Sequence, residues 1–362
     1  MIREVCDLLN RLGTRRDRPP LCQAVVVGIG TDPAAKVTLL LFDESGELGA
    51  VAKVARQDTG ERSLLAEHAV LVELWASPLP TTAEELPRPV LMTRLAGRAL
   101  LATTALRGGP LAVRYYQPGH VQDPRLVAED FQLAGTWIAR FQRETTTGEV
   151  VLGLEAFDRW VAPVFERYLA TVGSSPWEER LVDRLSRLAR ELDGVRVPVV
   201  AVHGDYAMGN LLAEGRQISG VVDWELGRRV GLPFSDLFKF AASYGSYLNR
   251  AAPPRNGALP GHPGWADACA RWGGSTKWAN ALGVLYSYFG RGWFPDMVRS
   301  FLHQHFRRLD VPPAAVSLFL PTFVAQQAMA LENPVFRAGY RSLLSVLYRD
   351  VDTSWLRLLE ML

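Results

Sequence analysis

Short apolar runs separated by polar turn clusters fill the first part of the chain. The runs AVVVGIG (24–30), KVTLLLF (36–42) and GAVAKVAR (49–56) are rich in valine and leucine, and the clusters TDPAA and DESGEL stand between them. Runs of this length between turn-forming residues are typical of β-strands. The pattern predicts an antiparallel β-meander.

A helical period then replaces this alternation. In residues 61–76, Leu64, Leu71 and Trp75 recur at the spacing of one helix face. The stretch PRPVLMTRLAGRALL (87–101) indicates a strand that runs into a glycine-bearing segment. The first part of the chain is therefore predicted to be a β-meander plus one helix.

After about residue 126 the pattern is mostly helical, as in LVAEDFQLAGTWIARFQRE (126–144). The exception is the segment 198–225, in which apolar runs bracket two polar turns. We expect an α+β fold of two domains, with residues 1–93 rich in β-strands and residues 94–362 mainly helical.

Composition narrows the function classes. The chain has 362 residues, 48% of them apolar, which is enough for one large core or for two domains in contact. A net charge of +2, without a basic block interleaved with aromatics, argues against nucleic acid as a partner. The three cysteines lack CxxC spacing, which predicts neither a disulfide framework nor a zinc site. Without a signal-peptide pattern or an apolar run near ~18 residues, we expect a cytoplasmic protein with no membrane partner.

The two polar turns carry candidate chemistry. The first, HGDYAMGN (203–210), places Asp205 and Asn210 five residues apart, and the second, DWE (223–225), supplies Asp223. If the intervening runs form a hairpin, these oxygen-bearing side chains meet at one end of it. Such oxygens suit magnesium, whose shell substrate phosphates complete, and phosphoryl transfer needs one further aspartate to accept a hydroxyl proton. The alternative is that these residues only form turns, which the combined spacing of the two motifs disfavours.

A phosphoryl-transfer site also needs a cation that contacts the nucleotide phosphates, and one lysine with one glutamate fits this need. Arginine outnumbers lysine 36 to 4, yet Lys53 is retained in the apolar run VAKVAR, where an unpaired cation is costly. Glu67 falls between Leu64 and Leu71 on the inward face of its predicted helix. Protein kinases use such a pair to hold nucleotide phosphates. The alternative is a solvent-facing lysine beside an unrelated glutamate.

Together these residues resemble the aminoglycoside phosphotransferase and choline kinase family of kinase-like small-molecule phosphotransferases. The resemblance rests on HGDYAMGN against the family's HGDxxxxN, on VVDWE, on VAKVAR with Glu67, and on VLMTRLAGRAL (90–100) as the hinge. It spans roughly residues 24–240. It implies a bilobal protein-kinase-like fold, with a β-rich nucleotide-binding lobe and a larger helical lobe, and it implies ATP (with GTP open) and Mg²⁺ as cofactors.

The resemblance also implies roles for the two turns. Asp205 would be the catalytic base or would orient the acceptor hydroxyl, and Asn210 and Asp223 would bind magnesium. His203 and Asp236 would support the catalytic loop without taking part in the chemistry. The DWE tryptophan and glutamate would be structural.

In the N-terminal lobe, the resemblance implies contacts to the nucleotide. Lys53, held by Glu67, would contact the phosphates. The phosphate loop is expected at GIGTDPAA (28–35), which lacks the third glycine of the usual motif. Backbone groups of the hinge would meet the adenine. The remaining candidates for nucleotide binding, from the loop and the hinge, are Gly30, Thr31, Met92 and Arg94.

The composition of the last third of the chain indicates the charge and the chemical class of the acceptor. Residues 231–362 hold 13 Lys and Arg against 8 Asp and Glu, whereas a polycationic aminoglycoside would need carboxylates around it. Eight aromatic residues between 265 and 294 suit sugar rings or flat groups, although they could equally form an ordinary helical core. We expect a hydroxylated small molecule, neutral or anionic rather than polycationic: a sugar, a nucleoside-type natural product or an antibiotic.

The leading prediction is an ATP- and Mg-dependent phosphotransferase that moves the γ-phosphoryl group to a hydroxyl of that molecule, with resistance, biosynthesis and metabolism as open settings. Two other classes remain. A non-catalytic nucleotide-binding protein of the same fold is disfavoured because Lys53, Asp205, Asn210 and Asp223 are all present. A protein kinase is disfavoured because the HRD, DFG and APE motifs are missing.

Overall fold

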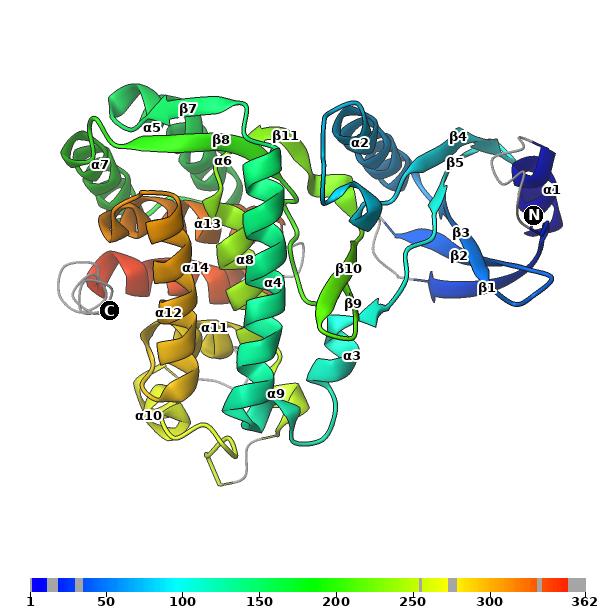
Figure 1. Ribbon diagram of the computed structural model, residues 1–362. Helices are drawn as coiled ribbons and strands as arrows, with labels where there is room; N and C mark the ends of the chain where they lie inside the picture. Colours follow the sequence, from blue (N-terminus) through cyan, green and yellow to red (C-terminus); the bar gives the residue numbers. More distant parts are fainter. Residues whose placement is uncertain are drawn as a thin grey trace. The chain divides into compact units, whose positions relative to one another are not determined.

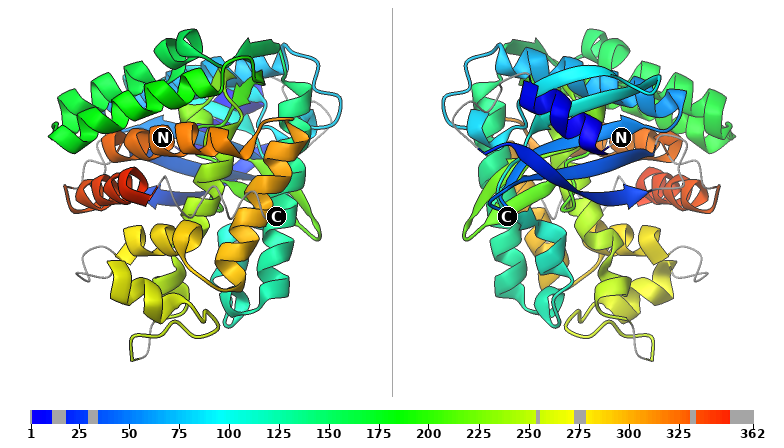
Figure 2. Two further views of the ribbon diagram at one scale, coloured as in Figure 1. Left: turned by 90° about the vertical axis from the view of Figure 1, so that its left-hand side faces the viewer. Right: turned by 90° about the vertical axis from the view of Figure 1, so that its right-hand side faces the viewer.

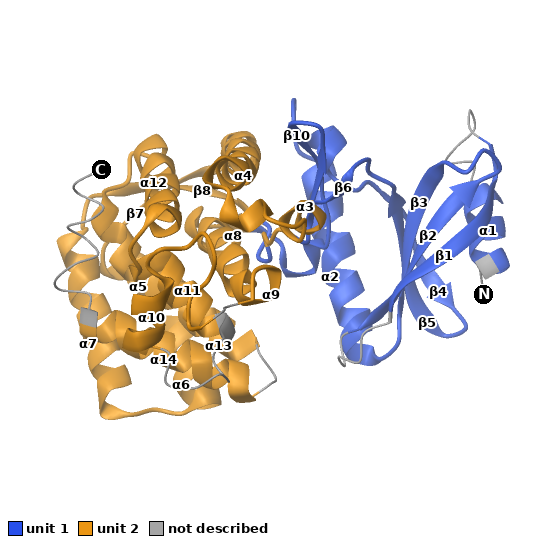
Figure 3. Cartoon of the chain, turned by 90° about the horizontal axis from the view of Figure 1, so that it is seen from below, with its two compact units in different colours: residues 1–110, 203–205, 209–229 blue, residues 111–202, 206–208, 230–362 orange. Residues whose placement is uncertain are grey.

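The chain forms two compact units in a computed structural model that describes residues 2–11, 19–29, 35–253, 256–272, 279–330 and 334–350 (Figure 1). Figure 3 shows unit 1 in blue, which comprises residues 1–110, 203–205 and 209–229. Unit 2, in orange, comprises residues 111–202, 206–208 and 230–362. The domain boundary expected at residue 93 falls inside a strand of unit 1.

Unit 1 is built on a five-stranded antiparallel sheet with the order β1-β2-β3-β5-β4. The strands are β1 (Leu21–Ile29), β2 (Lys36–Asp43), β3 (Leu48–Ala55), β4 (Pro89–Leu95) and β5 (Arg98–Thr104). The predicted meander is confirmed by the pairing of β1 with β2 and of β2 with β3. In the β2–β3 turn, Asp43 Oδ1 accepts the backbone N–H of Ser45 and of Glu47, each at 3.1 Å, as an aspartate does in a tight turn.

Helices cover both faces of this sheet. On one face, α1 (Ile2–Arg11) packs Val5 and Leu9 into a cluster with Ala52 and Val54, and Figure 2 (right) shows this dark blue helix lying over the strands. On the other face lies α2 (Asp58–Trp75), which begins three residues before the predicted helix. Because successive side chains of a strand point to opposite faces, Lys53 faces α2.

The chain leaves this sheet after β5, which corrects the predicted hinge. Residues 90–100 form a hairpin of β4 and β5 whose tight turn places Ala96 at φ 49° and Gly97 at φ 79°. A hairpin joins two strands of one sheet, so the hinge interpretation of this segment is wrong. The segment after Thr104 instead leads to β6 (Gly109–Pro110).

A second, three-stranded sheet of unit 1 has the order β10-β9-β6. It contains β9 (Leu211–Glu214) and β10 (Gln217–Val221), and unit 1 also holds the short helices η1 (Ala83–Glu85) and η3 (Trp224–Leu226). The connecting segment is fixed to this sheet, because Ser219 Oγ donates to Arg107 O at 2.7 Å.

Unit 2 is mainly helical. Its helices are α3 (Leu111–Tyr115), η2 (His120–Gln122), α4 (Pro124–Glu144), α5 (Leu154–Trp160), α6 (Ala162–Val172), α7 (Pro176–Glu191), α8 (Phe234–Ser246), α9 (Leu248–Ala251), α10 (Trp265–Trp272), α11 (Ala279–Phe289), α12 (Trp293–Arg308), η5 (Pro313–Ala315), α13 (Val316–Ala330) and α14 (Pro334–Asp350). The third sheet has the order β11-β8-β7, from β7 (Gly148–Val151), β8 (Arg196–Val202) and β11 (Arg228–Gly231). In the described part of the chain no single helix is long and apolar enough to span a membrane; α12 and α13 reach that length and composition only as a bent pair.

Local chemistry explains where the long helix α4 begins. Asp123 accepts the backbone N–H of Arg125 at 2.9 Å, and Pro124 occupies the first helical position. A capping carboxylate followed by proline is a favoured start for a helix.

The almost fully buried helix α8 crosses α11 at two glycines, where the helices approach closely. A Cβ on Gly245 would overlap Ser287, and a Cβ on Gly283 would overlap the carbonyl oxygen of Gly245.

The structure bears on the acceptor region in two places. The segment 106–125 contains β6, α3 and η2, and Tyr115 is buried with its hydroxyl donating to Tyr244 O at 2.8 Å. The aromatic residues of 265–294 that are buried in unit 2 are Trp265, Tyr286, Tyr288 and Phe294. These side chains support the alternative of an ordinary helical core.

Candidate active site

His203 shapes the loop that carries HGDYAMGN. Its Nδ1 accepts the backbone N–H of Asp205 at 3.2 Å, so its Nε2 carries the proton and donates to Val222 O at 2.8 Å. The ring is fully buried and stands edge-on to Trp224, with 4.5 Å between ring centroids. One histidine therefore joins the HGD turn to the DWE turn.

The glycine of HGD is required by the close approach of these turns. Gly204 has φ +79°, and a Cβ there would overlap the carbonyl oxygen of Leu226. A left-handed backbone without room for a side chain is a position that only glycine fills without strain. The motif thus places Asp205 one residue after the point where the two turns touch.

Asp205 and Asn210 are hydrogen-bonded to each other. Asn210 Nδ2 donates to Asp205 O at 2.9 Å and to Asp205 Oδ2 at 3.0 Å. The backbone carbonyl of Asn210 accepts the N–H of Val222 at 3.0 Å, at the open end of the β9–β10 hairpin. Since Asp223 follows Val222 directly, the three residues of the predicted constellation lie at the same end of the hairpin.

Lys53 lies between two carboxylates. Its Nζ is 2.6 Å from Glu67 Oε1 and 2.9 Å from Oε2, and it also contacts Asp223 Oδ1. Burial alone would lower the pKa of Lys53, but the charges of Glu67 and Asp223 outweigh burial and raise it. Burial alone would raise the pKa of Asp223, but Lys53 holds it below its usual value. Both groups therefore stay charged at neutral pH.

A second lysine, which the sequence reasoning missed, lies on the same face of the sheet. Thr38 pairs with Lys53 across β2 and β3, and Lys36 stands two residues before Thr38. Lys36 Nζ contacts Glu225 and lies 3.2 Å from Ser63 Oγ. The glutamate of DWE is thus held by a lysine, as the aspartate is. The scarcity of lysine that singled out Lys53 applies equally to Lys36.

The donor atoms beside Lys53 fit a magnesium ion. Asn210 directs its N–H groups to Asp205, and among the described residues none donates a hydrogen bond to its Oδ1 or to Asp223 Oδ2. Magnesium takes one or two such protein oxygens together with substrate phosphates and water. In the described part of the chain no three His, Cys, Asp or Glu side chains gather into a metal site of their own.

The other predicted residues are in β4, in α8 or outside the described residues. Gly30 and Thr31 belong to the latter group. Met92 and Arg94 are in β4, where Met92 packs under α2 and Arg94 forms an ion pair with Glu61. They lose the hinge position from which their adenine contacts were expected. Asp236 is fully buried in the first turn of α8.

Several solved structures of phosphotransferases are similar to this chain. Among solved structures, the macrolide 2'-phosphotransferase MphH from Brachybacterium faecium is 19% identical, with 94% of this chain and 98% of that chain covered and a TM-score of 0.42. The aminoglycoside-3'-phosphotransferase of type VIII is 22% identical, covering 77% and 97%, with a TM-score of 0.40. The aminoglycoside phosphotransferase APH(3'')-Id from Streptomyces rimosus is 18% identical, covering 84% and 98%, with a TM-score of 0.39. A search of curated proteins gave no match.

The family comparison covers more than half of the chain. The model of the phosphotransferase enzyme family, APH, matches residues 39–272, a range that includes Lys53, Glu67 and both polar turns. The predicted α+β class is confirmed, with sheets concentrated toward the N-terminal part and helices through the rest. Sequence and family model agree, and the chain belongs to the phosphotransferase enzyme family.

Proposed function

We propose that this phosphotransferase is an ATP- and Mg-dependent enzyme that moves the γ-phosphoryl group to a hydroxyl of a small molecule. The observation that carries the proposal is the cluster in which Lys53 contacts both Glu67 and Asp223. A simple ion pair between a lysine and an aspartate would not require a glutamate on the other side of the lysine. A lysine held by a helix glutamate, next to an aspartate at a hairpin end, is the arrangement that positions nucleotide phosphates beside a metal.

Asp205 is the proposed catalytic residue. The Asn210 amide holds its Oδ2 at 3.0 Å, and the His203 ring accepts its backbone N–H, so the carboxylate has a fixed position. Phosphoryl transfer through a loose transition state needs alignment of the acceptor hydroxyl more than a strong base. Asp205 therefore orients that hydroxyl and takes its proton as the new oxygen–phosphorus bond forms and the bond from the γ-phosphorus to the bridging oxygen breaks, which releases ADP. His203 and Asp236 are assigned to support of the loop.

The nucleotide phosphates are assigned to the Lys53 side of the cluster. Glu67 keeps the ammonium group directed toward Asp223, where the phosphates would replace part of the carboxylate contact. Asp223 and Asn210 would hold Mg²⁺, which when bound neutralises charge on the transferring phosphoryl group. Gly30 and Thr31 keep their proposed place in the phosphate loop, and the adenine contacts are reassigned from Met92 and Arg94 to the segment after Thr104.

The proposed acceptor is neutral or anionic rather than polycationic. The excess of Lys and Arg over Asp and Glu in residues 231–362 supports this choice. The aromatic side chains in that region give less support than expected, because Trp265, Tyr286, Tyr288 and Phe294 are buried. Sugars, nucleoside-type natural products and antibiotics remain the classes to test.

The test is ADP release from ATP with and without magnesium, across a panel of sugars, nucleosides, nucleoside antibiotics, macrolides and aminoglycosides. Wild type, Asp205→Asn and the control Asp183→Asn are run in parallel, because Asp183 is exposed on α7. We expect one acceptor class to stimulate release, and Asp205→Asn to lower kcat by about 10³-fold or more, with ATP affinity nearly unchanged.

Each other outcome points to a different conclusion. If Asp205→Asn turns over like the control, Asp205 is not the catalytic residue. If ATP binds but no acceptor stimulates release, and magnesium does not tighten ATP binding, the chain is a non-catalytic nucleotide-binding protein. Labelled phosphate that appears on protein substrates alone would identify a protein kinase.

A further inference from the structure

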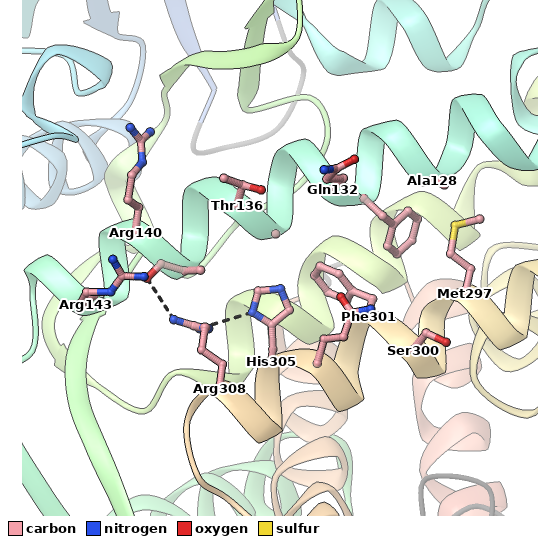
Figure 4. Close-up of a pocket in the computed structure, with 14 residues that line it drawn as sticks. Ala128, Gln132, Thr136, Arg140, Arg143, Met297, Ser300, Phe301, His305 and Arg308 are labelled. Atoms are coloured by element: carbon pink, nitrogen blue, oxygen red, sulfur yellow. Dashed lines mark hydrogen bonds between the residues drawn. The ribbon is translucent and has the colours of Figure 1, made fainter. Parts of the chain in front are cut away.

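Unit 2 contains a groove between α4 and α12 that the proposed chemistry does not use (Figure 4). Its volume is about 670 Å³, and its floor is formed where Phe301 and His305 pack onto the backbone of α4. Gly135 permits this approach, since a Cβ there would lie 2.9 Å from His305 Nε2 and 3.1 Å from Phe301 Cε2. The groove is therefore lined by well-packed residues of two long helices.

One end of the groove is positively charged without a matching acid. Arg143 and Arg308 meet there, and none of the residues that line the groove is an aspartate or a glutamate. Arg308 is held in place, because it donates to Ala139 O at 3.0 Å and to Gln142 Oε1 at 2.6 Å. In the described part of the chain Arg143 has no ion-pair partner. Burial, together with the charge of Arg143, lowers the pKa of Arg308 to about 10, so the Arg308 guanidinium is still charged at neutral pH.

His305 adds a neutral hydrogen-bond donor beside these arginines. Burial and the charge of Arg308 lower the pKa of His305 to about 3, so the ring is neutral. Arg308 lies 3.3 Å from His305 Nδ1, the acceptor nitrogen, which leaves the proton on Nε2. No described residue accepts that proton. A ligand that accepts hydrogen bonds and carries negative charge would pair with the two guanidinium groups.

The other end of the groove is apolar. Met297 and Phe301 on α12, with Phe131 on α4, line it, and the polar groups along the rim are Gln132, Thr136, Ser300 and Gln304. The lining residues of α12 run from Met297 to Arg308, a length of about 16 Å at 1.5 Å per helical residue. The charged and apolar ends are thus far enough apart for a molecule with a distinct head and body.

The groove lies on the opposite side of α4 from Tyr206, the residue of HGDYAMGN that packs on this helix within unit 2. Tyr206 of HGDYAMGN donates to Ala134 O at 2.9 Å and stacks on Trp137, with 5.7 Å between ring centroids. Residues 135, 136 and 139 of the same helix line the groove. Within unit 2, α4 therefore separates the groove from Tyr206.

We propose that the α4–α12 groove is a second ligand site, which binds an elongated organic anion. Its carboxylate, sulfonate or phosphate group lies between Arg143 and Arg308, and its apolar body lies along Phe301 and Met297. The inference does not depend on the proposed phosphoryl transfer.

The test uses a pair of probes that differ in charge. 8-Anilinonaphthalene-1-sulfonate is an aromatic anion of suitable length, and N-phenyl-1-naphthylamine is its neutral counterpart. Each is titrated by fluorescence into the full chain with excess ADP and magnesium, which keeps the nucleotide site occupied. The variants are Arg143→Gln, Gln304→Glu and the control Arg307→Gln. Arg307 is exposed on α12 next to the groove but does not line it, and its substitution changes the net charge as Arg143→Gln does.

We expect the sulfonate to bind the wild type at one site and to lose about fivefold or more in affinity in Arg143→Gln and in Gln304→Glu. The control should stay within about twofold, and Arg143→Gln should leave binding of the neutral probe unchanged. Thermal unfolding of each variant checks that the fold is intact. The proposal is overturned if the sulfonate does not bind the wild type, if Arg143→Gln and Gln304→Glu bind it as the wild type does, or if the control weakens it equally.

Discussion

The two glycines of HGDYAMGN differ in whether the backbone leaves room for a side chain. Gly204 has φ +79° and no room for a Cβ beside Leu226 O, whereas Gly209 has neither a positive φ nor an atom within 4 Å of an added Cβ. Gly204→Ala should therefore lower the free energy of unfolding by about 1–3 kcal/mol and reduce kcat, because it moves Asp205. Urea unfolding and turnover of the variant measure both effects.

Gly209→Ala is the matched control in the same loop. It should change the free energy of unfolding by no more than about 0.5 kcal/mol, since an added methyl group meets only open space. Equal losses in the two variants would mean that the loop tolerates an added methyl group at neither glycine. The conformation of Gly204 would then not be the reason for the motif.

Two lysines show which residues of the candidate site can be predicted from the sequence and which cannot. Lys53 was found because a lysine inside an apolar run needs a partner, and its neighbour Glu67 stood at the right helical position. Lys36 was missed because it begins its strand next to a turn, where a lysine needs no explanation. Its contact with Glu225 depends on the β2–β3 register and on a turn far along the chain, and neither is visible in local sequence.

At the scale of elements, periodicity predicted the strands of the meander and α2, because one buried face repeats along each. Apolar periodicity does not predict the β4–β5 turn, so in the sequence its residues resemble a hinge. That turn depends on positive φ at Ala96 and Gly97, which apolar periodicity does not report. The short α3 was missed for a related reason, since a helix of five residues holds too few periods to be seen.

The crossing of α8 and α11 gives a prediction at this scale. Gly283→Ala would place a methyl group against the Gly245 carbonyl oxygen, so the helices must separate. Overpacking of this kind typically costs 1–3 kcal/mol, and we expect a loss of about 2 kcal/mol in the free energy of unfolding. Urea unfolding measures it, with Gly148→Ala as the control because an added Cβ there has no neighbour within 4 Å. A Gly283→Ala variant as stable as the control would show that the crossing is loosely packed.

At the scale of the whole molecule, the candidate site is assembled from distant parts of the sequence. Lys53 and Asp223 are 170 residues apart, yet they share one contact within unit 1. The sequence indicated each by its residue type and neighbours, whereas their contact requires the β9–β10 hairpin to lie beside the face of the sheet that carries Lys53. Motif spacing could therefore name candidates but could not define the cluster.

The stability of the whole molecule in acid depends on its buried histidines, because a histidine that stays neutral in the folded core takes up a proton when the chain unfolds. Burial lowers the pKa of His262 to about 4 and that of His305 to about 3, against 6.5 for an ordinary histidine. Below pH 6.5 the unfolded chain takes up protons that the folded chain does not, so the free energy of unfolding must fall as the pH decreases.

Each histidine should contribute a slope of up to about 1.4 kcal/mol per pH unit between pH 6 and pH 4. His262 donates through Nε2 to Val121 O at 2.7 Å, and His262→Gln keeps a donor there but removes the titration. Urea unfolding at several pH values should therefore give a shallower slope for His262→Gln than for wild type or for the control His303→Gln, whatever their stabilities at pH 7. Parallel slopes in all three proteins would mean that His262 takes up its proton without unfolding, and that the core around it admits a charge.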